Sequence, residues 1–342
     1  MTRISYLNLD LNTYGNLLGL GKGCIRLKDK KGKETLYPLH ERVIGDITVK
    51  SGNVISSSLL CSLAYWNIDL LISTRNGKPL AVFRNLDDDS HVEIRIAQYA
   101  ALRNGKGYSM AKQFVKCKIE GQNHLLAKYG YKTHDVILNK VNAAEAPSLA
   151  RLRAKLLGLE GKYSNYYFKQ IFKEFPEKIR PSNRSAFKAY TGVNNVLNLC
   201  YRILFWKCYT SLVKNHMEPY LGYLHSVQFG RPSMVCDFME LYRYLVDDFV
   251  IGYCQDLTPR DFVAKREMVG KKMAKRIFLS DELTDDCLEE LSRFFDKRFP
   301  VPSVRRGRRI QLNTLIKEES FRMWAYLLGT REAEWVPKIA VP

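Results

Sequence analysis

Residues 91–104, HVEIRIAQYAALRN, mark the point at which the sequence changes from one pattern of hydrophobic residues to another. Apolar side chains here recur at positions i, i+3, i+4 and i+7, the spacing that places them on one face of an α-helix. The same spacing returns in later stretches, at 108–130, 146–172, 191–216, 231–254, 281–299 and 311–329. The sequence therefore predicts a helical domain over residues 91–342.

The sequence before residue 85 has the pattern of β-strands instead. Short runs rich in β-branched and apolar residues alternate with turn-forming stretches such as KDKKGKE and RNGKP. The expected strands lie at 4–11, 23–29, 34–39, 42–49, 69–74 and 79–83. One helix is expected at 56–67, with Ser56 or Ser57 as its N-cap.

We therefore predict an α+β protein. Its small β-rich N-terminal domain would occupy residues 1–85, and its larger all-α domain would occupy residues 91–342. The polar stretch NLDDDS, at 85–90, is the expected linker between them.

The charge balance restricts the possible partners. The 342 residues include 54 Lys and Arg but 35 Asp and Glu, which gives a formal net charge of +19. Such an excess favours polyanions, either nucleic acid or an anionic membrane surface. A membrane partner is disfavoured, because no apolar run approaches the roughly 20 residues that cross a bilayer. Nucleic acid is the favoured partner, and a basic protein without one is the alternative.

The cysteines indicate the cellular compartment. Eight are scattered along the chain, none of them in a CxxC pair, and several lie within apolar runs. Such residues are typical of buried thiols rather than of disulfides or zinc ligands, so we expect a cytoplasmic protein.

Residues 220–243, YLGYLHSVQFGRPSMVCDFMELYR, contain one of six histidines, followed by two carboxylates. Asp237 and Glu240 are three residues apart, which places them on one face of the expected helix. Carboxylates in so apolar a segment are costly to bury unless a cation compensates them. Arg243 could form a salt bridge with them, or a divalent metal could bind them together with His225. This stretch leaves both interpretations open.

Two further stretches place polar residues in apolar surroundings. Glu160 follows a stripe of leucines and would face inward or line a cleft, unless it is an ordinary solvated glutamate near a helix end. Asn194 and Asn198 share a face at the start of an apolar helix. They could order neighbouring side chains, bind phosphate, or act as caps and satisfied buried amides.

Three motifs, in this order, resemble the CRISPR-associated Cas1 family of metal-dependent DNA nucleases and integrases. The first is a Leu-rich helix ending in Glu-Gly and aromatics, LLGLEGKYSNYYF at 156–168. The second is RPSNRSAFKAYTGVNNVLN at 180–198, in which Thr191 and Gly192 replace the family's Asp-Pro pair. The third is the Gly-x-x-His and Asp-x-x-Glu segment at 222–243, with methionine where leucine is usual.

The resemblance implies a β-rich N-terminal domain used for dimerisation and a helical catalytic domain. It implies that Glu160, His225 and Glu240 are both the catalytic residues and the ligands of Mg²⁺ or Mn²⁺, ions that two carboxylates and an imidazole suit. It places Asp237 beside them as an additional acidic or orienting residue, and Asn194 in the second motif. A homodimer and a small ferredoxin-like partner, Cas2, are also implied.

The implied reaction is phosphodiester transfer. The metal would polarise the scissile phosphate and lower the pKa of the attacking oxygen. In the family that oxygen belongs to a DNA 3′-hydroxyl, and the product is spacer DNA joined to the CRISPR array. With water as the nucleophile, the same site would cleave DNA.

Two basic segments are candidates to bind double-stranded or branched DNA. The first, AKREMVGKKMAKR at 264–276, is equally compatible with a solvated helix face. The second, VRRGRRIQ at 304–311, is the favoured contact with phosphates. The predicted DNA-binding residues are Arg305, Arg306, Arg308, Arg309 and Lys162.

Two alternatives stay open. A transposon-borne integrase of the same superfamily would share the metal site but act beside terminal inverted repeats. A non-catalytic, basic DNA-binding scaffold would not bring Glu160, His225 and Glu240 together. The sequence leaves unresolved the native metal and whether Asp237 binds it directly.

Overall fold

The computed structural model describes residues 6–11, 13–39, 43–66, 68–74, 79–85, 91–185, 192–269, 272–302, 309–330 and 334–342. The chain divides into two compact units, Met1–Val92 and Glu93–Pro342. Each unit has a hydrophobic core of its own. Apart from Asn85, the expected linker at 85–90 lies outside the described residues.

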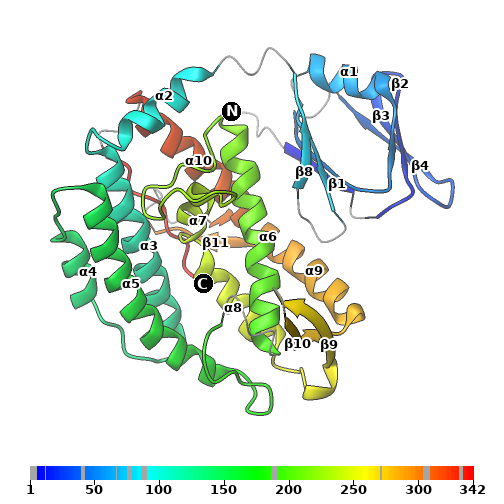
Figure 1. Ribbon diagram of the computed structural model, residues 1–342. Coiled ribbons are helices and arrows are strands. Elements are labelled where there is room, and N and C mark those ends of the chain that lie inside the picture. The colour runs from blue at the N-terminus through cyan, green and yellow to red at the C-terminus, as the bar shows by residue number, and fades with distance from the viewer. Residues whose placement is uncertain are drawn as a thin grey trace. The chain divides into compact units, whose positions relative to one another are not determined.

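In its described part, the N-terminal unit consists of two four-stranded sheets and one helix (Figure 1). One sheet has the order β1 (Tyr6–Leu11), β5 (Val43–Lys50), β7 (Leu70–Ser73), β8 (Pro79–Phe83). The other has the order β4 (Glu34–Pro38), β3 (Cys24–Lys28), β2 (Leu17–Gly21), β6 (Val54–Ile55). Helix α1 (Ser57–Tyr65) begins at Ser56, whose hydroxyl accepts a hydrogen bond from the Leu59 amide, so the first of the two expected N-caps is the actual one.

The second unit is mainly helical, and the predicted fold class is confirmed. Its longer helices are α2 (Val92–Ala101), α3 (Lys106–Lys128), α5 (Leu149–Ile171), α6 (Val193–Lys214), α8 (Arg243–Tyr253), α9 (Asp281–Asp296) and α10 (Leu312–Leu328). Shorter helices are α4 (Val136–Asn142), α7 (Ser233–Met239) and the 3₁₀ turns Phe172–Glu174 and Pro259–Asp261. Among the described residues, no helix is both long enough and apolar enough to cross a membrane.

Two short β-pairs interrupt the helices. Strands β9 (Phe262–Val269) and β10 (Lys272–Leu279) are antiparallel, as are β11 (Arg298–Pro300) and β12 (Arg309–Gln311). The basic segment at 264–276 is therefore part of a β-hairpin and not a helix face. The hairpin pairs Phe262 with Leu279 at its base, and this cross-strand contact is not visible in the local sequence pattern.

The helix expected at 231–254 is divided into α7 and α8. The division falls at three consecutive amides, those of Glu240, Leu241 and Tyr242, which donate to carbonyls three residues earlier. These tighter bonds end α7 and allow the chain to change direction before α8 begins. Glu240 consequently lies at a helix end instead of on a continuous helix face.

Helix α3 packs against both α5 and α8, and its side-by-side arrangement with α5 is visible in Figure 1. The contact with α8 depends on Gly121, because a Cβ atom at this position would lie 2.2 Å from Cδ1 of Tyr244. Tyr244 is buried, and its hydroxyl donates to the carbonyl of Ala340. Lys118 lies one turn before Gly121, so this close approach also sets the position of Lys118 relative to the chain that enters α8.

We expect Gly121→Ala to lower the free energy of unfolding by about 1–3 kcal/mol, because overpacking against Tyr244 outweighs the gain in helix propensity. The control is Gly158→Ala on α5, where no atom outside the neighbouring residues and the helix's own backbone lies within 4 Å of the added methyl group. This variant should gain up to about 1 kcal/mol. Urea unfolding measures both, and equal stability of the two variants would contradict the packing argument.

Candidate metal centre

Three charged side chains from separate segments of the helical unit meet at one point. Lys118 is on α3, Glu160 is on α5, and Glu240 directly follows α7. The ammonium of Lys118 forms ion pairs with Oε1 of Glu160 and with Oε2 of Glu240, the latter at 2.7 Å. The side chains of Lys118, Glu160 and Glu240 are 10%, 18% and 5% exposed. Two carboxylates that are distant in sequence therefore share one largely buried cation.

The electrostatics of Glu240 favour its ionised form. Burial by itself raises the pKa of this carboxyl, but Arg243 and Lys118 more than offset the effect and hold the pKa at about 2. Nη1 of Arg243 lies 2.7 Å from Oε1. Protonated His225 is close enough to act in the same direction. Within the described residues, Oε2 has the Lys118 ion pair but no donor in hydrogen-bonding geometry.

The imidazole of His225 is oriented by Asp237, which is fully buried. Nδ1 of His225 lies 2.6 Å from Oδ1 of Asp237. The same carboxylate accepts hydrogen bonds from the backbone amides of Tyr223, Leu224 and His225, at 2.6, 2.8 and 2.8 Å. Four donors fill the acceptor positions of Asp237. In the neutral imidazole, Nδ1 then carries the proton, and Nε2 keeps the lone pair that a metal can bind.

A side chain of α5 also holds the backbone of the segment that precedes His225. Arg153 donates to the carbonyls of Gly222 and Tyr223, at 2.6 and 2.7 Å. A Cβ atom at position 222 would lie 2.6 Å from the carbonyl oxygen of His225 and 2.8 Å from Cβ of Ser233. The glycine of the Gly-x-x-His motif is therefore required by close packing around the histidine.

We expect Asp237→Asn to lower the free energy of unfolding by about 3 kcal/mol even without metal, because an amide group cannot accept all four hydrogen bonds. Urea unfolding in EDTA measures the effect. Asp256→Asn, at an exposed carboxylate, is the control and should be neutral. Unchanged stability of Asp237→Asn would argue against its role in orienting the histidine segment.

The low pKa of Glu240 predicts a specific response to acid. Its pKa is about 2 in the folded protein and near 4.5 when unfolded, so the unfolded chain takes up the proton first. The stability contributed by the carboxylate is present above pH 5 and is lost as the pH falls toward 2. Urea unfolding between pH 5 and 2 should therefore show a smaller pH slope for Glu240→Gln than for the wild type. Glu145→Gln, at an exposed residue, should retain the wild-type slope.

Asn194 is buried near the start of α6. A series of side-chain contacts connects it to Glu240. Arg184 donates to Oδ1 of Asn194 at 3.2 Å and to Oδ1 of Asn198 at 2.7 Å. The Arg184 guanidinium lies 5.2 Å from the centroid of the Tyr201 ring. The Arg243 guanidinium lies 4.4 Å from the same centroid. Asn194 is thus connected to the carboxylates indirectly, through Arg184, Tyr201 and Arg243.

The predicted DNA-binding residues are only partly described. Arg305, Arg306 and Arg308 lie outside the described residues. Arg309 is exposed on β12, where its guanidinium donates to the carbonyl of Arg298 at 3.1 Å. Lys162 is exposed on α5, two residues after Glu160. Both described residues can therefore reach an external phosphate.

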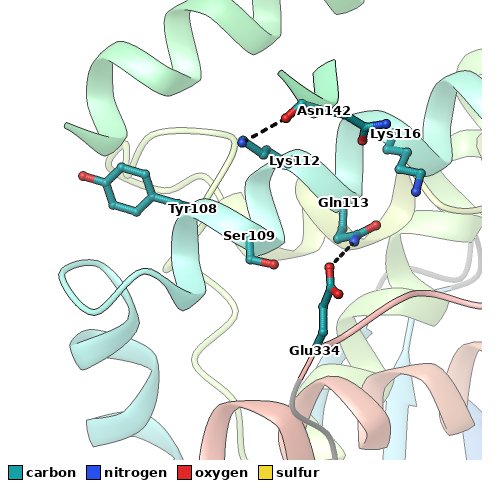
Figure 2. Close-up of a pocket in the computed structure, with 7 residues that line it drawn as sticks. All are labelled: Tyr108, Ser109, Lys112, Gln113, Lys116, Asn142 and Glu334. Carbon is teal, nitrogen blue, oxygen red and sulfur yellow. Dashed lines mark hydrogen bonds between the residues drawn. The ribbon is translucent and has the colours of Figure 1, made fainter. Parts of the chain in front are cut away.

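A pocket of about 370 Å³ is lined mainly by residues of α3 (Figure 2). Lys112 donates to the Asn142 carbonyl at 3.2 Å, and Gln113 donates to Glu334 at 3.2 Å, as the dashed lines in Figure 2 show. Its lining residues are Tyr108, Ser109, Lys112, Gln113, Lys116, Asn142 and Glu334. None of them is a predicted catalytic residue, so the pocket is separate from the acidic centre.

Among the described residues, no group of three His, Cys, Asp or Glu side chains is arranged so that it could hold a metal ion. Glu160 and Glu240 both contact the Lys118 ammonium. Lys118 was not among the site residues predicted from the sequence. A signal was present, because Lys118 lies on the face of α3 that also includes Phe114, Gly121 and Leu125, all of them buried. A lysine on such a face requires a buried anionic partner.

A family model described as "CRISPR associated protein Cas1" matches residues 9–293. The chain belongs to the Cas1 family. The resemblance inferred from the three motifs is confirmed, and so is the class of enzyme, a Cas1 endonuclease and integrase.

Curated Cas1 relatives match most of the chain. The "CRISPR-associated endonuclease Cas1 1" of Archaeoglobus fulgidus is 28% identical over 360 aligned residues, which cover 96% of this chain and 98% of the relative. The corresponding endonuclease of Korarchaeum cryptofilum is 26% identical over 280 residues, 74% of this chain and 82% of its own length.

Solved structures show the same fold at lower sequence identity. A chain of a "Partial Cas6-RT-Cas1--Cas2 complex" has a TM-score of 0.73 at 19% identity, with 97% of this chain and 98% of that chain covered. A "Casposase bound to integration product" has a TM-score of 0.69 at 19% identity, with 97% and 93% covered.

Proposed function

We propose that this Cas1 protein is a metal-dependent DNA integrase and endonuclease of CRISPR adaptation, with its centre at Glu160, His225 and Glu240. The observation that best supports this centre is the convergence of two glutamates on one cation, together with a histidine that is held by a buried aspartate and acts electrostatically on Glu240. Burying several charges is costly even when they are paired, and a functional role can justify that cost, which a non-catalytic scaffold does not require.

The residues present suit Mg²⁺ or Mn²⁺. Glu160 and Glu240 offer carboxylate oxygens, Oε2 of Glu240 lacks a well-aligned hydrogen bond, and Nε2 of His225 offers a nitrogen. Once bound, the metal would polarise the scissile phosphate and lower the pKa of the attacking hydroxyl or water.

The chain's own groups position these ligands. Asp237 holds His225 in the tautomer that presents Nε2, and Arg153 fixes the backbone of the same segment. Arg243 keeps Glu240 ionised, so the carboxylate is ready to bind a cation at neutral pH. We assign Asp237 the role of orienting residue, because its acceptor positions are already filled.

The proposed reaction is attack of a DNA 3′-oxygen on a phosphodiester. The new P–O bond joins the incoming strand, and the displaced 3′-oxygen leaves and takes up a proton. Water in place of the 3′-hydroxyl gives strand cleavage instead. Exposed Lys162 and Arg309, with Arg305, Arg306 and Arg308, are the proposed phosphate contacts along double-stranded or branched DNA.

The proposed partners follow from solved relatives. The complexes contain Cas2 beside Cas1, and the casposase is bound to an integration product. We accordingly propose that this chain binds DNA and a small ferredoxin-like Cas2, and that it forms a homodimer through residues 1–85. We place this activity in the cytoplasm, where the CRISPR array is found.

A transposon-borne integrase is the second candidate, because the casposase fold is as similar as that of Cas1 chains, with TM-scores of 0.69, 0.67 and 0.73. The curated sequence relatives favour the CRISPR assignment. The neighbouring DNA separates the two candidates, since repeat arrays indicate CRISPR and terminal inverted repeats indicate a transposon.

The decisive experiment is a strand-transfer and cleavage assay on branched and duplex DNA with Mg²⁺, Mn²⁺ or EDTA. We expect Glu160→Gln, His225→Ala and Glu240→Gln each to reduce activity by about 10²-fold or more, because each removes a metal ligand. DNA affinity in a filter-binding assay should be kept, and the exposed control Glu145→Gln should retain full activity.

One result of the same assay would contradict the catalytic proposal. If the wild type binds DNA but is inactive with every metal, both with and without Cas2, the catalytic proposal fails and a DNA-binding scaffold becomes the better explanation.

A further inference from the structure

Lys118 is an unusual component for a centre proposed to bind metal. It is a positively charged side chain, it is largely buried, and it contacts both glutamates that would hold a divalent cation. Like charges repel strongly in such surroundings, where the effective dielectric constant is low. The ammonium and a metal ion would therefore compete for the same two carboxylates.

Protein side chains supply both negative and positive charge around the centre. Its anionic groups are Glu160, Asp237 and Glu240. Its cationic groups are Lys118, Arg243 and Arg153, the last of which acts electrostatically on Asp237. The cations that contact Glu160 and Glu240 already offset part of the negative charge that would attract a divalent cation.

The three cations differ in their freedom to move. Arg243 bonds to Glu240 and stacks over the Tyr201 ring, and Arg153 is held by two backbone carbonyls. Lys118 carries a compact ammonium on a flexible four-carbon stem, which can turn to a different acceptor. Of these three cations, Arg153 is held by backbone carbonyls and Arg243 by an aromatic ring, whereas the contacts described for the Lys118 ammonium are those with the two carboxylates.

We propose that Lys118 is an internal counter-cation that positions Glu160 and Glu240 and weakens metal binding until a DNA phosphate attracts its ammonium away. This inference rests on the proposed function. A phosphate near the centre adds negative charge, draws Lys118 toward itself and leaves the two carboxylates to the metal. Metal and DNA consequently bind with positive coupling, and by linkage each raises the affinity of the other.

The test measures Mn²⁺ affinity rather than activity. Free Mn²⁺ is followed by electron paramagnetic resonance with the full-length protein, with and without a branched DNA that has dideoxy 3′ ends, after subtraction of binding to DNA alone. The variants are Lys118→Met, which removes the charge, and Lys118→Arg, which keeps it. The matched control is Lys116→Met on the same helix, where the lysine pairs with Glu120 at 3.9 Å.

Without DNA, Lys118→Met should bind Mn²⁺ at least about tenfold more tightly than the wild type, because one positive charge is removed from the site. Lys118→Arg and Lys116→Met should remain within about twofold of the wild type. DNA should raise the affinity of the wild type by a larger factor than that of Lys118→Met. Equal or weaker Mn²⁺ binding by Lys118→Met would overturn the inference.

Thermal unfolding gives an independent readout. In EDTA, Lys118→Met should have a lower Tm than the wild type, because two carboxylates lose their shared cation, and saturating Mn²⁺ should restore the Tm. If Lys118→Met does not fold, the wild type still tests the proposal, since equal Mn²⁺ affinity with and without DNA contradicts it.

The outcomes separate the two proposals. If the wild type binds Mn²⁺ and Glu240→Gln abolishes binding while Lys118→Met has no effect, the metal centre stands and the role of Lys118 fails. If neither the wild type nor Lys118→Met binds Mn²⁺ in any condition, including with DNA, both proposals fail.

Discussion

Burial of the Glu240 carboxylate is the constraint on which the arrangement of the helical unit depends. A carboxylate on a side chain that is 5% exposed remains ionised only when cations compensate it. Arg243 does so from the start of α8, and Lys118 does so from α3, where it also pairs with Glu160 of α5. The packing of three helices is therefore tied to one acidic side chain, and Gly121 permits the close approach that the ion pairs need.

The two halves of the centre are held in different ways. His225 is fixed through Asp237, whose oxygens receive four hydrogen bonds, and through the backbone contacts of Arg153. Glu160 is more exposed, at 18%, and depends on Lys118 and on Ser164, which donates to it at 3.1 Å. Such a site combines a preorganised imidazole with a carboxylate that can adjust when a ligand arrives.

Local patterns predicted the elements whose stability is local. The spacing of apolar residues located the long helices α3, α5, α6 and α10, and Ser56 was one of the two N-caps expected from their position before an apolar run. Strand β2 was missed, because glycines interrupt the leucines of LLGLG and weaken the strand signal. Hairpin β9–β10 was also missed, since its register depends on cross-strand pairs such as Phe262 with Leu279.

The sequence by itself determined the family, the fold class and the identities of the proposed ligands, because these depend on residue types at fixed spacing along the chain. The tertiary structure alone placed Glu160 and Glu240 on the same ammonium, used Asp237 to orient His225, and revealed Lys118 as their partner. Contacts of this kind join residues far apart in sequence, and their energies depend on burial and on the direction of each side chain. Neither quantity exists before the chain has folded.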